Sequence, residues 1–132
     1  PPLLVSAQGT PDGQESVITL RFPDDSLGVV LYTARGDVTF PKERIEVFAG
    51  KGVAVLDDFR TLAFSGMPGR AHKGAPDKGH RALLENFGAA IHGEAPLAIS
   101  GLDGLRATAV ALAALESIQT GRAVPLSLPP EN

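Results

Sequence analysis

The chain has 132 residues, the length of one ordinary domain, and 43% of them are hydrophobic. Its formal net charge is −3, so no basic surplus points to a nucleic acid partner, and it has no cysteine for a disulfide framework, a zinc ribbon or a thiol nucleophile. The longest uninterrupted apolar run, residues 109–115, is far shorter than the roughly 18 residues that span a bilayer. These features predict an acidic, cytoplasmic globular protein without a membrane partner.

The chain begins directly with a strand-like segment, residues 3–7, and shows no signal-peptide pattern. We therefore expect it to be the later part of a longer protein. The alternative is a complete small protein with a trimmed N-terminus.

The first half of the chain predicts short strands separated by tight turns. Pro-Asp-Gly at 11–13 and Gly-Lys-Gly at 50–52 are strong turn signals. The expected strands and extended segments are 3–7, 15–22, 27–34, 38–41, 44–49, 53–57 and 60–65.

Segment 27–34 differs from its neighbours because it is apolar on both faces. Val29 and Leu31 alternate with Val30 and Tyr32. A strand of this kind is covered on both faces, so a second cover is expected from a partner subunit or another domain.

The second half predicts two helices after a Gly/Pro-rich loop at 66–76. The first helix spans 77–92, with Asp77 as its N-cap and Gly93 as its end. The second spans 102–120, opens with a capping box at residues 100–103 and ends at Gly121. Its spacing predicts that Leu105, Ala109, Leu112 and either Leu115 or the neighbours of Glu116 are buried. Its many small residues predict close packing on the sheet.

A last strand is expected at 124–128. Strands followed by helices predict a single α+β domain over 1–132. We expect an antiparallel, mostly meander, open-faced sheet of about six or seven strands with two helices on one face.

Known catalytic and cofactor motifs find little support in the sequence. The only G-x-G, at 50–52, lies between two strands and is predicted to be a hairpin, and the glycines at 69 and 74 are not followed by Lys-Ser/Thr. Asp77, His80 and His72 could hold a metal in a small hydrolase, but helix capping and solvation explain them better. Ser65 lacks the G-x-S-x-G elbow. We therefore predict no catalytic residue, no metal and no cofactor site in this chain.

Charged residues gather near one predicted strand and one predicted helix start. They suggest a cationic cluster that receives an anionic or polyhydroxylated ligand, because a helix N-terminus favours such groups. A solvated strand edge is the competing explanation. The candidate substrate-binding residues are Lys42, Arg44, Lys78 and His80.

Several stretches taken together resemble the C-terminal domain of the Gfo/Idh/MocA oxidoreductases, the glucose–fructose oxidoreductase and inositol dehydrogenase family. The similarity covers nearly all of the chain, and the pattern at its end is moderately specific for the family. The stretches are 32–37, 40–48, 57–60, 77–87, 90–93, 113–118 and 120–126.

This resemblance implies an NAD(P)-dependent oxidoreductase acting on a sugar or polyol, with an N-terminal Rossmann domain that is not in this chain. The second domain of such enzymes lines the substrate cleft and forms homo-oligomers through its open sheet face. The family's dinucleotide fingerprint, its Glu-Lys-Pro and its Asp-x-x-x-His helix lie upstream, so no catalytic residue carries over and the chain alone is expected to be inactive. The alternative is a self-standing, non-enzymatic ligand-binding or dimerisation module.

Overall fold

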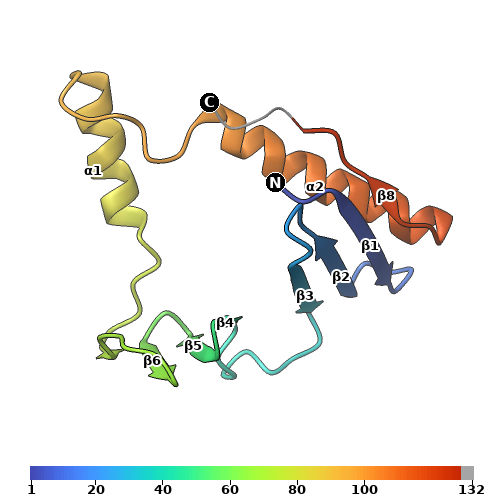
Figure 1. Ribbon diagram of the computed structural model, residues 1–132, viewed down its shortest axis with the longest axis horizontal. Coiled ribbons are helices and arrows are strands. Elements are labelled where there is room, and N and C mark those ends of the chain that lie inside the picture. Colours follow the sequence, from blue (N-terminus) through green and yellow to red (C-terminus); the bar gives the residue numbers. More distant parts are fainter. Residues whose placement is uncertain (129–132) are drawn as a thin grey trace. The chain divides into compact units, whose positions relative to one another are not determined.

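The strands of this computed structural model form two antiparallel four-stranded sheets, and the structure describes residues 1–128 (Figure 1). The chain divides into two compact units. The first comprises Pro1–Gly36 and the residues from Ile99 onwards, and the second is Asp37–Ala98. The predicted α+β class with antiparallel, open sheets is confirmed, but the strands are shared between two sheets where we expected one.

The sheet of the first unit has the order β3-β2-β1-β8. Its first three strands form the predicted meander, and the short β8 pairs with β1 from the far end of the chain. The elements of this unit are β1 (Leu4–Gly9), β2 (Glu15–Arg21), β3 (Leu27–Thr33), α2 (Gly101–Thr120) and β8 (Val124–Pro125).

Helix α2 begins and ends where the sequence predicts. The Ser100 side chain accepts from the Asp103 N–H while the Asp103 carboxylate accepts from the Ser100 N–H, which completes the capping box. The same Ser100 hydroxyl donates to Asp103 at 2.7 Å and, with the backbone N–H, holds the pKa of that carboxyl below its ordinary value. Gly121 ends the helix in the left-handed conformation, at φ 67°.

Small side chains join α2 to β1, which lies alongside it (Figure 1). Val5, Ala7, Ala113 and Ala114 are buried together, and the Ala7 N–H donates to the buried Ser117 Oγ at 2.8 Å. Partly buried hydrophobic residues surround this core, namely Ile18, Leu20, Val110, Ile118, Val124 and Leu126.

The predicted close packing is therefore confirmed, but the predicted buried face of α2 is wrong. Leu105, Leu112 and Leu115 are 55–60% exposed, and Ala109 is only half-buried. The face that carries Ala113, Ala114 and Ser117 meets β1 instead, because small side chains let the helix backbone approach the strand closely.

The strand register settles which face of β3 lies on the α2 side. Val30 pairs with Ile18, which pairs with the buried Ala7, so these residues share the α2 side of the sheet. Val29 pairs with Thr19 on the opposite side. We call that side the outer face; its large apolar residues are Val17, Leu27, Val29 and Leu31, exposed by 44%, 74%, 66% and 75%.

The sheet of the second unit has the order β4-β5-β6-β7 and is also a meander. Gly50 and Lys51 both have positive φ and connect β4 to β5, which confirms the predicted hairpin at 50–52. The elements of this unit are β4 (Arg44–Ala49), β5 (Gly52–Asp57), β6 (Thr61–Ser65), β7 (His72–Lys73) and α1 (His80–Ile91).

Two predicted details of the second unit are wrong. Helix α1 begins at His80 with left-handed Gly79 as its N-cap, whereas the Asp77 carboxylate accepts from the Gly79 N–H at 2.8 Å and forms a turn before the helix. The predicted extended segment 38–41 begins with a turn, because the Thr39 N–H and hydroxyl both donate to the Asp37 carboxylate. Gly93, at φ 73°, follows α1 as predicted.

Candidate functional site

The turn between β5 and β6 is the most unusual piece of backbone in the second unit. Asp58 and Phe59 both have left-handed φ, 48° and 53°, and the Arg60 N–H closes the turn on the Asp57 carbonyl at 2.9 Å. Asp tolerates this conformation, but a bulky residue such as Phe rarely adopts it, and the strain is on the order of 1 kcal/mol. The surrounding structure must therefore hold Phe59 in place.

Backbone hydrogen bonds from two other segments hold this turn. The Asp58 N–H donates to the Glu43 carbonyl at 2.7 Å, which ties the turn to the residue before β4. The Asp77 N–H donates to the Phe59 carbonyl at 3.1 Å, which ties it to the segment before α1. The β5–β6 turn is thus the place where three stretches of the second unit meet.

Lys78 adds side-chain contacts at the same place. Its ammonium group forms an ion pair with the Glu43 carboxylate and lies 5.6 Å from the centre of the Phe59 ring. The ring face attracts a cation at this distance. We call Lys78, Glu43 and Phe59 the clamp.

The structure brings part of the predicted cationic set together. Lys78 reaches Glu43, which lies between Lys42 and Arg44 in the chain. Arg44 is neutralised by Glu46 at 2.7 Å and lies 3.9 Å from Asp57. Within residues 1–128, neither Lys42 nor His80 has an ion pair, and both side chains are exposed. Carboxylates therefore pair with Arg44 and Lys78. The side chains of Lys42 and His80 remain accessible to a ligand.

Sequence reasoning missed Glu43 and Phe59 as members of this site. Glu43 could have been found, because it lies inside the Lys-Glu-Arg stretch that suggested the cluster. Nothing in the sequence pattern indicates a left-handed phenylalanine, since that conformation is fixed by contacts with distant segments.

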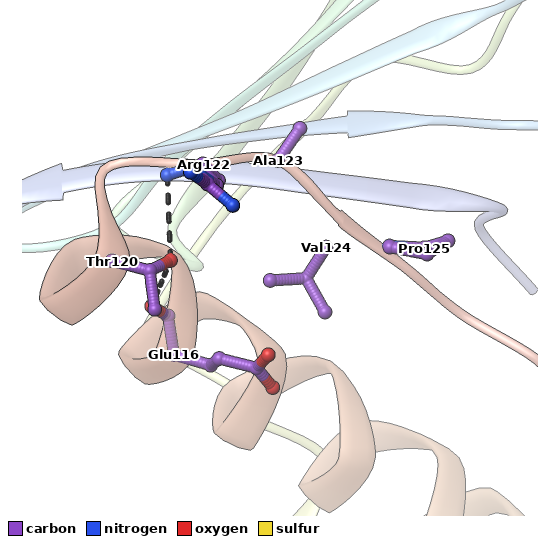
Figure 2. A pocket seen from close by; sticks show the side chains of 6 residues that line it. All are labelled: Glu116, Thr120, Arg122, Ala123, Val124 and Pro125. Atoms are coloured by element: carbon purple, nitrogen blue, oxygen red, sulfur yellow. Dashed lines mark hydrogen bonds between the residues drawn. The ribbon is translucent and has the colours of Figure 1, made fainter.

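The first unit has a shallow hollow at the end of α2, with a volume of about 470 Å³ (Figure 2). The Thr120 hydroxyl donates to the Glu116 carbonyl at 2.8 Å and accepts from the Arg122 N–H at 3.4 Å. These groups complete the end of the helix. The hollow is lined by Glu116, Thr120, Arg122, Ala123, Val124 and Pro125.

Residues 1–128 contain neither a cluster of metal ligands nor a membrane-spanning helix. No three His, Asp or Glu side chains in that range come together as they would around a metal ion. None of its helices is both long enough and apolar enough to cross a membrane.

Comparison with known proteins identifies the fold. No protein-family model and no curated relative matches the sequence. Solved structures do match: an oxidoreductase from Agrobacterium radiobacter, at TM-score 0.77 and 19% identity, and an aldose–aldose oxidoreductase from Caulobacter crescentus, at 0.76 and 20%. A candidate myo-inositol dehydrogenase from Sinorhizobium meliloti 1021 matches at 0.72 and 24%.

These matches cover 94%, 95% and 96% of this chain but only 43%, 41% and 44% of the three neighbours. The chain therefore spans less than half the length of the proteins that it resembles. Its resemblance to the Gfo/Idh/MocA oxidoreductases is confirmed at the level of the fold, which is that of one part of these oxidoreductases and dehydrogenases.

Proposed function

We propose that this chain is the C-terminal, substrate-side and oligomerisation domain of an NAD(P)-dependent oxidoreductase of the Gfo/Idh/MocA type. The observation that carries the proposal is the likeness over nearly the whole chain to about two fifths of such proteins. The Agrobacterium neighbour was solved with NAD⁺. The remaining part of the full-length protein would then hold the nicotinamide cofactor.

The Gly-Lys-Gly stretch does not fit a dinucleotide. Gly50 lies in the hairpin turn between β4 and β5 and Gly52 begins β5, whereas a pyrophosphate site needs glycines between a strand and a helix. The proposed roles of the chain itself are therefore to contact the substrate and to form the oligomer.

A sugar or polyol is the proposed substrate class. The neighbours point to polyhydroxylated compounds, since one is named for aldoses, one for myo-inositol and one was solved with L-tartaric acid. Hydroxyl and carboxylate oxygens of such molecules accept hydrogen bonds from ammonium and imidazole groups. The exposed side chains of Lys42 and His80 supply such donors.

Cofactor titration tests the division of roles. We expect the 132-residue chain alone to give no binding signal with micromolar NADH, because it lacks a glycine-rich strand-to-helix loop. The intact oxidoreductase should bind NADH under the same conditions. Calorimetry that detects micromolar binding by the chain alone would contradict the proposal. An upstream reading frame without a dinucleotide-binding domain would favour the self-standing module.

Substitution of Lys42 or His80 tests the proposed substrate surface. Lys42→Ala or His80→Ala should raise KM in the intact enzyme by roughly tenfold, because each substitution removes one hydrogen-bond donor to the substrate. The free energy of unfolding should change by no more than about 0.5 kcal/mol, because both side chains are exposed. Steady-state kinetics and urea denaturation measure the two effects. Unchanged KM in both variants would refute this surface as the substrate side.

Self-association through the outer face completes the proposal. The register places Val17, Leu27, Val29 and Leu31 on one side of the first sheet, and α2 packs against β1 and β8 on the other side. Monomers rarely leave a large contiguous apolar patch exposed. A second copy related by a two-fold axis can bury this patch against itself.

A further inference from the structure

Two backbone hydrogen bonds hold the strained turn between β5 and β6, and Lys78 contacts residues at both of them. Phe59 has no local reason to adopt φ 53°, since it is neither Gly nor Asn. Its backbone carbonyl accepts from Asp77, and its ring lies under the ammonium group of the next residue along, Lys78. The same ammonium group pairs with Glu43, whose carbonyl accepts from Asp58.

Each clamp residue comes from a different segment of the second unit. Glu43 immediately precedes β4, Phe59 lies between β5 and β6, and Lys78 lies two residues before α1. The side-chain contacts thus repeat the connections that the Asp58 and Asp77 amides make through the backbone. The strained conformation at Phe59 is therefore held both by backbone hydrogen bonds and by side-chain contacts, which fix the position of the β5–β6 turn.

We propose that Lys78 is a positioning residue: the clamp of Lys78, Glu43 and Phe59 fixes the β5–β6 turn against the segments before β4 and α1. Its charge is committed to the Glu43 carboxylate and the Phe59 ring. Lys42 and His80 are then the hydrogen-bond donors of this surface that face a ligand. Only this last assignment rests on the proposed function; the clamp itself does not.

Amide hydrogen exchange of the intact protein tests the clamp without any ligand. Lys78→Met removes the charge and keeps the length of the side chain. We expect the Asp58 and Asp77 amides to exchange roughly fivefold faster, because their hydrogen bonds join the segments that the clamp holds. Glu43→Gln should speed exchange at the same two amides, whereas Lys78→Arg should restore protection, since a guanidinium group can make both contacts.

Arg81→Met is the matched control. It removes a neighbouring but more exposed ion pair, Arg81–Glu85 at 2.7 Å, from the first turns of α1. Exchange at Asp58 and Asp77 should not change in this variant. The amides of β5, a strand that pairs with β4 on one side and with β6 on the other, report whether the second unit remains folded.

Two results would overturn the proposal. One is a Lys78→Met protein in which Asp58 and Asp77 keep their protection while the β5 amides remain protected. The other is unaltered exchange in Glu43→Gln, which would mean that Glu43 does not hold Lys78. If Lys78→Met loses protection in β5 as well, the Glu43→Gln and Lys78→Arg variants decide. If KM is unchanged in Lys42→Ala and His80→Ala while amide exchange responds to Lys78→Met as expected, the clamp stands. Only the ligand-binding roles of Lys42 and His80 are then refuted.

Discussion

Val29→Glu is expected to convert a self-associated protein into a monomer. Val29 lies on the outer face of the first sheet, 66% exposed, between Leu27 and Leu31 on the same strand face. Across a two-fold axis, two copies of this face would bring like charges close together, which costs several kcal/mol. The dissociation constant should rise about a hundredfold or more. Sedimentation velocity at about 20–50 µM of the intact protein measures the change.

Val30→Glu is the matched control, because the strand register separates the two neighbouring valines. Val30 shares its face with Ile18 and Ala7, on the α2 side, yet lies on the edge strand and is 47% exposed. A glutamate there should be tolerated without dissociation. A clean monomer for the unmodified protein, or equal dissociation in both variants, would refute the outer face as the interface.

Local sequence signals predicted the parts of the fold that are decided locally. Ser100 and Asp103 define the start of α2 by themselves, because the capping box needs only two side chains and the adjacent backbone. Gly121 and the Gly-Lys-Gly hairpin are equally local, since each depends on a left-handed residue in a short turn. These features were confirmed as predicted.

Where local signals compete, the sequence was less informative. Asp77 precedes a helical pattern and was predicted to cap it, but its carboxylate accepts from Gly79 and delays the helix to His80. Both arrangements satisfy an aspartate, and the sequence does not distinguish between them. The same ambiguity affected Asp37, whose turn replaced the start of an extended segment.

Features decided by distant contacts could not be predicted. The alternation in β3 showed that both faces are apolar, but the pairing with β2 and β1 was needed to assign Val30 to the α2 side. The charged stretch at 42–44 indicated a cluster, yet its geometry depends on Lys78 and on the left-handed Phe59, far apart in sequence. Pattern analysis thus found the region of the candidate site and missed the contacts that shape it.

The packing of α2 against β1 leads to the second prediction, a large loss of stability when this contact is disturbed. Leucine spacing predicted that Leu112 is buried, whereas Ala114 is 3% exposed and Leu112 is 60% exposed. The helix approaches β1 so closely that a Cβ atom on Gly9 would lie 3.0 Å from Ile118 Cδ1. There is little room for extra atoms between the two elements.

Ala114→Leu should therefore destabilise the protein by about 3 kcal/mol, because three added carbon atoms must force α2 away from Val5 and β1. Separating them would also stretch the hydrogen bond from the Ala7 N–H to Ser117 Oγ, now 2.8 Å, and leave a buried donor poorly paired.

Leu112→Ala is the opposite test on the same helix. It should change stability by no more than about 0.5 kcal/mol, since the side chain is exposed and alanine favours a helix. Urea denaturation of both variants measures the difference, and a larger loss from Leu112→Ala would mean that the leucine face, not the alanine face, meets the sheet.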